Sequence, residues 1–400
     1  MIMRRSNLII IGNIMAAILL FGTAGCRRQR KTEEGVSSES AQKMELTATS
    51  EYAVNVEEGA LESEKIETES NESQSAFPSA YKSKKKMVTF DCALEVPNEF
   101  LNGNFSMPSV RGINYGDPQK QYDVLVKPHE SEIAETDKNE SLEDGKPDDM
   151  FYDLANGDHY TTGNGVNFYT PKGIKYGRVL PHDEGILSHN IFTFGTPDDK
   201  INEIKKLVND IGYSSDQYAF SWYSLSSEER NKMEQQAVEE GRVTSENIPD
   251  QWEQGDDTYT IYAWQNYNGL DVLPWYMTVN MRAAEMDFST APLTAVFDED
   301  GLQTFQMSAP IMLENTDKTG EAVQVLPFEK IADAVENRFE SMITDQHYTV
   351  KKAKMVLRTY NDENQKLSAE VVWHLTVTDD KGNIQILMYD ALTGKEIFLT

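Results

Sequence analysis

The residues of this 400-residue chain that could do chemistry are sparse, and none forms a recognisable catalytic or metal-binding motif. No pair of histidines has the i, i+4 spacing of a zinc-binding helix, and the His-Glu-x-x-His motif is absent. His182 and His189 come closest to a cluster, and we favour a surface or packing role for them over a metal site. The six histidines are His129, His159, His182, His189, His347 and His374.

The sequence also lacks the motifs of nucleophilic, nucleotide-binding and redox enzymes. There is no Gly-x-Ser-x-Gly elbow, no phosphate loop and no dinucleotide fingerprint, so we expect no cofactor and no catalytic residue. Cys92 alternates with apolar residues, which predicts a small core residue and not a reactive thiol. A secreted hydrolase remains the least favoured alternative, because 66 acidic residues make chance carboxylate pairs such as Asp256 and Asp257 inevitable.

Two segments could line a ligand site. Residues 157–165 are polar and glycine-rich, and a mobile loop is the favoured interpretation. Residues 252–276 are rich in Tyr and Trp, whose rings suit contact with sugars or peptides. Packing inside strands is the competing and favoured interpretation, because strands are enriched in these residue types. The candidate ligand-binding residues are Trp252, Tyr262, Trp264 and Trp275.

Cys26 ends a segment that is ordered like a secretory signal. Arg4 and Arg5 precede an apolar run over residues 8–21, which is short for a membrane span, and small residues lead to Cys26. Gly22-Thr23-Ala24-Gly25-Cys26 resembles the lipobox of bacterial lipoproteins, although leucine is usual in place of Thr23. The resemblance implies a signal peptide over residues 1–25, a diacylated Cys26 and an extracytoplasmic protein held on the cell membrane. An uncleaved membrane anchor is the alternative.

A long acidic segment follows Cys26. Residues 32–80 contain 12 Glu, two Lys and few large apolar residues, so we predict a disordered spacer over residues 26–86. The net charge of −29 argues against nucleic acid as a partner. The chain has two cysteines, and acylation of Cys26 leaves no disulfide to stabilise the folded part.

The remaining sequence alternates between strand and helix patterns. The period-2 pattern of residues 88–96 predicts a half-buried strand, and Thr196-Pro197 begins an amphipathic helix. Residues 130–149 are acidic and predict an exposed loop. Further strands are expected at 122–126, 218–222, 258–264, 276–281 and 350–358, helices at 226–240 and 327–343, and hairpins at 293–306 and 370–390. This order indicates an α+β fold of antiparallel sheets with helices packed on one face, in two related modules.

The last of these segments resembles a PepSY-type module, whose final strand runs into an Asp-Ala-x-Thr-Gly turn. Here that turn is Asp390-Ala391-Leu392-Thr393-Gly394, and Trp373 matches a tryptophan common before the last hairpin. Asp390 and Thr393 can accept hydrogen bonds from the turn backbone, and Gly394 tolerates a positive φ. We therefore divide the folded part into an α+β region over residues 87–325 and a PepSY-like module over residues 326–400.

A longer part of the chain is similar to clostridial lipoproteins that are grouped as a family of unknown function. The similar features are the strand at 90–96, the 297–305 hairpin followed by Ala309-Pro310, and Leu326-Pro327-Phe328 at a helix start. The region from Phe328 onward also resembles YycI-like regulatory modules. PepSY-type modules are associated with inhibiting or regulating surface peptidases and sensors, and no catalytic residue carries over.

Together these features predict a non-enzymatic lipoprotein of the cell envelope that binds a membrane or wall protein. The alternative is a lipoprotein that binds wall glycan, peptide or a small solute through the aromatic residues.

Overall fold

The structure is a computed structural model, and it describes most of the chain after residue 76. The described ranges are 77–101, 105–143, 145–181, 187–244, 251–277, 286–315, 323–342 and 346–398. The expected signal peptide, Cys26, the spacer up to residue 76 and His182 lie outside these ranges. Residues Ser75–Thr400 make up one compact unit, with no division near residue 325. Within the described ranges, no helix combines the length and apolarity that crossing a membrane requires.

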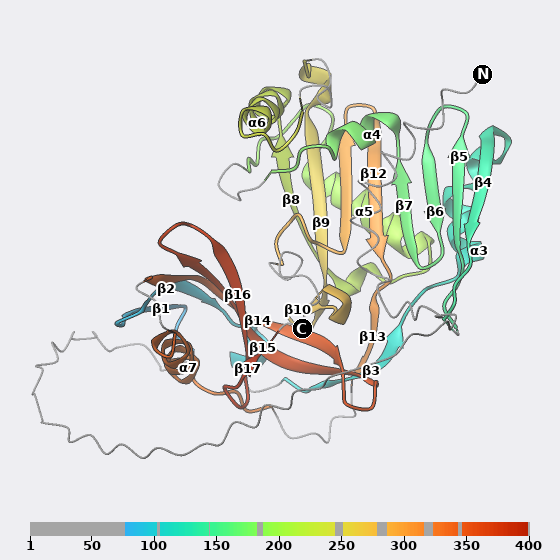
Figure 1. Cartoon of the computed structure of the whole chain (residues 1–400). Coiled ribbons are helices and arrows are strands. Elements are labelled where there is room, and N and C mark those ends of the chain that lie inside the picture. Colours follow the sequence, from blue (N-terminus) through green and yellow to red (C-terminus); the bar gives the residue numbers. More distant parts are fainter. Residues whose placement is uncertain are drawn as a thin grey trace, which may run out of the picture. The chain divides into compact units, whose positions relative to one another are not determined.

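The fold is α+β and mostly antiparallel. Hydrogen bonds join fifteen of the described strands into one sheet, and two further strands pair separately. Its first part, from one edge to the other, consists of β8 (Tyr218–Leu225), β9 (Thr258–Tyr267), β11 (Leu293–Asp298), β12 (Gly301–Ser308), β7 (Gly165–Tyr169), β6 (His159–Thr162), β5 (Asp149–Leu154) and β4 (Ile133–Asn139). Figure 1 shows these strands side by side.

Two helices cover one face of this first part. They are α3 (Pro118–Leu125) and α5 (Pro197–Asp210), and Figure 1 shows α5 behind the strands. α5 begins at Thr196, whose hydroxyl accepts a hydrogen bond from Asp199 N in a capping box. The buried stripe of α5 packs against alternate strand residues, so each strand has one face toward this core. The α5 residues of this core are Ile204 and Val208, with Ile211 directly after the helix.

The second part of the sheet packs against one helix, α7 (Phe328–Glu340). Its strands are β1 (Ala80–Lys84), β2 (Val88–Glu95), β10 (Leu270–Leu273), β14 (Tyr348–Asn361), β15 (Leu367–Asp379), β16 (Ile384–Asp390) and β17 (Glu396–Ile397). β14 is parallel to both β2 and β10, whereas its pairing with β15 is antiparallel. β10 also pairs with β9, and this pairing joins the two parts of the sheet.

Smaller elements complete the described fold. The ribbon of β3 (Pro108–Ile113) and β13 (Ile311–Asn315) is antiparallel, and both of its strands contribute to the α7 core. α4 (Pro171–Tyr176) approaches β12 so closely that a Cβ on Gly173 would lie 2.2 Å from Gln303 O. The remaining elements are α2 (Asn98–Leu101), α6 (Ser227–Glu239), η2 (Lys127–Glu132), η4 (Ser215–Gln217), η6 (Gln254–Asp256) and η7 (Trp275–Met277).

Most expected elements are confirmed, including both amphipathic helices and both hairpins. Four expectations are wrong. Residues 122–126 are mostly helical, because Asp117 caps α3 at Pro118 and outweighs the β-branched residues. The expected loop at 130–149 contains η2 and β4, and the expected loop at 157–165 is the β6–β7 hairpin. Tyr276 and Met277 lie in η7 and not in a strand, while 278–281 lie outside the described residues.

The N-terminal strands differ from the expected organisation in two ways. β1 lies inside the range assigned to the spacer, and it pairs with β2 along its whole length. Both strands contribute to the same core as α7, β14, β15 and β16 instead of starting a separate N-terminal region. The sequence did not reveal β1, because Lys82 and Lys84 on its exposed positions and the half-buried Ser83 give it the polar composition of a spacer.

Candidate functional site

The four candidate ligand-binding aromatics do not form one site. Tyr262 and Trp264 stand two residues apart on β9 and so share a face, but Trp264 is 5% exposed and packs in a core with Met277 and Met286. Trp252 is 6% exposed and lies in a different cluster. Trp275 is half-buried in η7, where its backbone N–H donates to Thr359 Oγ1. Trp264 is therefore a buried strand residue, whereas Trp252 is buried outside the described strands.

Trp252 belongs to a buried polar cluster that the sequence did not reveal. Its ring stacks on Tyr176 at 5.0 Å between centroids, and its Nε1 donates to Glu234 Oε2 at 2.8 Å. The guanidinium of Arg230 lies 4.5 Å from the Tyr176 ring centre and 5.3 Å from the Trp252 ring centre. Arg230 donates to Tyr176 O and Thr258 Oγ1. These contacts make the cluster a cation–π stack closed by hydrogen bonds.

Charge is incompletely compensated in this cluster. Arg230 is 3% exposed and Glu234 is 2% exposed, but among the described residues Arg230 Nε and Glu234 Oε1 have no hydrogen-bond partner. Burial raises the pKa of Glu234, although Trp252 and Arg230 act in the opposite direction. By contrast the neighbouring carboxylate of Asp298 is fully satisfied, because Tyr176, Gln303 and Lys172 all donate to it.

The face of the first sheet part that lies opposite α3 and α5 has a different character, and we call it the polar face. Strand register aligns its side chains in two rows across seven strands. The first row is Tyr223, Thr260, Val296, Thr304, Tyr169, His159 and Asp153. The second row is Ser221, Tyr262, Thr294, Gln306, Asn167, Thr161 and Phe151. Hydroxyls, amides and rings dominate both rows, and the second row carries no charge.

Several polar side chains of the polar face are largely buried from solvent. Asn167 is 3% exposed and Thr161 is 6% exposed, while Gln306 and Thr294 are half-buried. The ring of Phe288 contacts that of Tyr223 and covers the β8 end of the first row. Gly173 of α4 lies next to the Thr304 side chain. Within the described residues, the side-chain amides of Asn167 and Gln306 make no hydrogen bond to another side chain. Such amides can donate to and accept from a ligand.

The one charged end of the polar face is at β5 and β6. Asp153 Oδ1 lies 2.6 Å from His159 Nδ1, and His159 Nε2 lies 3.3 Å from Thr161 Oγ1. The three side chains are strand neighbours, since His159 is opposite Asp153 and two residues from Thr161. The Tyr169 ring lies 6.4 Å from the imidazole. The arrangement fixes the ring of His159 on the sheet surface.

The sequence singled out Tyr262 as a candidate and residues 157–165, which include His159 and Thr161, as a segment that could line a site, but it did not reveal the other members of the polar face. No local motif marks Asn167 or Gln306, because their proximity depends on how β7 pairs with β12. Alternation of Val166 and Phe168 with Asn167 was the available signal, since it predicts a strand with one polar face. Among the described residues, no group of three or more His, Cys, Asp or Glu side chains is arranged to hold a metal ion.

Cys92 is a buried core residue, and burial raises the pKa of its thiol to about 11. It lies on the α7 side of β2, as its alternation with apolar residues predicted.

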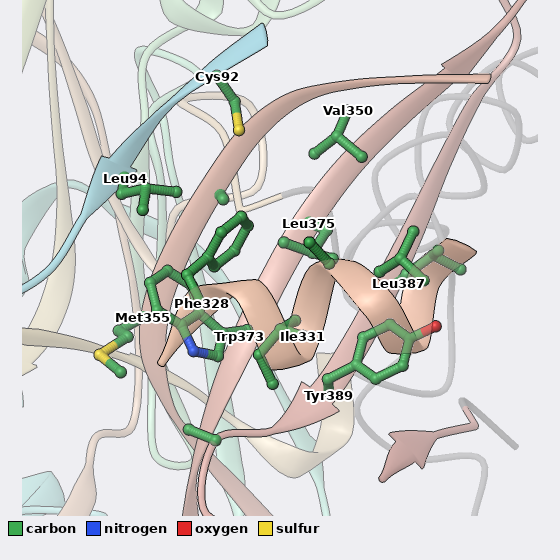
Figure 2. Close-up of a cluster of buried hydrophobic side chains, with 14 of the residues drawn as sticks. Cys92, Leu94, Phe328, Ile331, Val350, Met355, Trp373, Leu375, Leu387 and Tyr389 are labelled. Carbon is green, nitrogen blue, oxygen red and sulfur yellow. The ribbon is translucent and has the colours of Figure 1, made fainter. Parts of the chain in front are cut away.

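The terminal turn has the geometry expected of it. Asp390 Oδ1 accepts hydrogen bonds from Leu392 N and Thr393 N, and Gly394 has φ +70°. Trp373 is fully buried, with its ring 4.8 Å from that of Phe328 in an edge-on contact. Figure 2 shows Phe328 and Ile331 of α7 beside Trp373, and Leu375 lies next along β15. These residues form the core of the C-terminal part.

Comparison with known proteins identifies a structure with the same fold but does not assign the chain to a family. No protein-family model and no curated protein matches the sequence. The structure is similar to an uncharacterised protein from Eubacterium rectale ATCC 33656, with a TM-score of 0.55 and 15% identity over 81% of this chain and 94% of that chain. The Bacillus megaterium YpeB C-terminal domain gives a TM-score of 0.28 at 9% identity, over 70% of this chain and 92% of that domain. The chain is therefore an α+β protein that shares its fold with the Eubacterium rectale protein.

Proposed function

We propose that this chain is a lipid-anchored protein of the cell envelope that acts by binding a partner and not by catalysis. The observation that carries the proposal is the order of its parts: a signal-like segment ending at Cys26, an acidic stretch, and then one compact unit. A flexible acidic stretch of this length would hold the folded unit away from the membrane surface.

The partner in this proposal is a membrane or wall protein, and the PepSY-like C-terminal part is the proposed contact region. Its turn at Asp390–Gly394 carries the exposed side chain of Leu392, and Phe398 after β17 is 69% exposed. The choice of this region rests on its resemblance to PepSY-type modules, and these two side chains lie within it.

Lipid attachment is tested by growing cells with labelled palmitate. We expect the wild-type chain and Cys92→Ser to carry the label, and Cys26→Ser to lose it, since Cys26 and Cys92 are the two cysteines of the chain. Label retained by Cys26→Ser contradicts the anchor. Affinity capture of the full chain from cells should then enrich one membrane or wall protein, and repeated recovery of none from folded protein would count against the binding function.

A second candidate function is binding of an uncharged wall glycan by the polar face. Its specific support is the row that joins Tyr262, Gln306 and Asn167 without a charged side chain. Thermal-shift measurements with neutral glycan fragments test it. We expect the melting temperature of the wild type and of the exposed control Gln235→Ala to rise, and that of Gln306→Ala to rise less. Equal shifts in all three proteins place binding elsewhere.

A further inference from the structure

The edge strand β8 has one side without a strand partner in the described structure. β8 pairs with β9 along its whole length, from Tyr218 to Leu225. On its other side the described residues provide a single bridge, between Ser188 and Ser224. Beyond Ser188 the chain leaves this edge, because Phe192 N donates to the hydroxyl of Tyr259 on the sheet face.

The Ser188 bridge defines which backbone groups point away from β9. Ser224 N donates outward to Ser188 O at 2.8 Å. Because outward groups alternate along an antiparallel strand, the N–H and C=O of Trp222 and Phe220 also point outward. Tyr218 N is already used, since it donates to Ser215 O. The free part of the edge is therefore the stretch from Phe220 to Trp222.

β8 is unlike the other edges of the sheet. The described edge strands are β1, β4, β8 and β17. β1 carries Lys82 and Lys84, β4 carries acids and Lys138, and β17 has two residues. Charges and short length are the usual protection of an edge against added strands. β8, with the sequence YAFSWYSL, has eight residues with neither a charge nor a proline. Its edge is open to a further strand.

A lysine that has no anionic partner among the described residues lies beside this edge. Lys205 of α5 places its Nζ 5.4 Å from the centre of the Phe220 ring. On the same helix Lys200 pairs with Glu203 and Lys206 with Asp210, whereas Lys205 forms no ion pair with a described residue. Among the described residues, Lys205 therefore has no ion pair that would compete with an acidic group bound beside this edge. The ring of His189 also lies beside this edge, 4.8 Å from that of Trp222.

We propose that the β8 edge binds an extended acidic segment of a partner protein as an added strand. Backbone groups of Phe220 and Trp222 would supply the hydrogen bonds, and an Asp or Glu of the segment would pair with Lys205. Ser188 occupies the position beside Ser224 and Ser215 O accepts from Tyr218 N, so the added strand pairs with the stretch from Phe220 to Trp222. The inference rests on the proposed binding function, because it requires that the partner is a protein.

The probe for this edge is a library of random twelve-residue peptides selected against the full chain. We expect selected peptides to alternate β-branched and polar residues and to share one acidic position. Binding of a selected peptide should weaken about tenfold or more in Lys205→Glu and stay unchanged in the control Lys206→Glu, which reverses the same charge on the same helix. Replacing the acidic residue of the peptide by Lys should restore binding to Lys205→Glu.

The backbone contribution is tested at Phe220. Phe220→Pro removes an outward N–H that β9 does not use, while Phe220→Val keeps it, so only the proline variant should lose peptide binding. Melting temperatures of both variants check that they are folded. The inference is overturned if Lys205→Glu and Phe220→Pro both bind the peptide as tightly as the wild type does. It is also overturned if β8 mediates dimerisation and binds no peptide. If a cellular partner is captured equally well by these variants, the binding function stands and the β8 edge does not mediate it.

Discussion

At the scale of single residues, Glu234 is the most constrained titratable group of the polar cluster. Its Oε2 accepts a hydrogen bond from the Trp252 indole N–H, and its Oε1 has no partner in the described part of the chain. Burial raises its pKa above the ordinary value of 4.5. The folded chain therefore binds more protons than the unfolded chain between pH 4.5 and the pKa of the folded state. The free energy of unfolding falls as pH rises through this window.

We predict that Glu234→Gln removes this pH dependence. Glutamine keeps an oxygen for the Trp252 N–H but does not ionise, so the stability of the variant relative to wild type should increase as pH rises above 4.5. Urea unfolding at several pH values measures the difference. Glu239→Gln, at an exposed position of the same helix, is the control. Parallel pH profiles of Glu234→Gln and wild type would show that Glu234 does not titrate in this window.

Residue roles were predictable where the interaction is local. The Asp390 turn and the core position of Cys92 follow from neighbouring residues, and both are confirmed. Arg230 and Asn167 were not predictable, because their surroundings come from strands and helices far apart in the sequence. Tyr262 was identified for its residue type alone, and its neighbours depend on strand register.

At the scale of elements, local caps explain why the two long helices of the first sheet part begin where they do. Thr196 with Asp199 and Ser226 with Glu229 form capping boxes at α5 and α6. The sequence revealed both starts, since a capping residue and its acidic partner lie within one turn. It misassigned residues 122–126 because a short helix with β-branched residues has the composition of a strand.

We predict that Thr196→Ala destabilises the protein by about 1 kcal/mol, the usual cost of losing an N-cap hydroxyl. The variant loses the hydrogen bond from Asp199 N to Thr196 Oγ1, which spans 3.2 Å. Thr193→Ala, at an exposed position just before the helix, should change stability little. Urea unfolding of both variants at neutral pH provides the comparison, and equal losses in the two would argue against the cap.

At the scale of the whole molecule, the folded unit begins earlier than the composition indicated. Tyr81 of β1 packs edge-on against Phe328 at 5.0 Å between ring centroids, and Phe77 lies 6.4 Å from Trp373. Composition could not place this boundary, because exposed residues of an edge strand resemble those of a spacer. The α+β class was predictable from the order of helix and strand patterns.

We predict that a chain starting at Ser75 melts at the same temperature as the chain starting at Cys26, whereas a chain starting at Met87 melts lower. The shorter chain loses β1 and the aromatic contacts of Phe77 and Tyr81, and removal of one buried aromatic typically costs about 3 to 5 kcal/mol. Thermal unfolding followed by circular dichroism measures the three proteins. Equal melting temperatures for all three would place β1 outside the cooperative unit.

The pairing of β2 with β14 has a consequence for how the protein reaches this state. Thr89 meets His347 across a separation of 258 residues, so the α7 core closes only after nearly the whole chain has been synthesised. Contacts of such high sequence separation slow folding, because a long loop must close before they form. Before β14 is available, the apolar face of β2 lacks the strand that pairs beside it in the α7 core. A chain that ends before β14 therefore cannot complete this core. The α7 core therefore depends on the last strands of the chain as much as on the first.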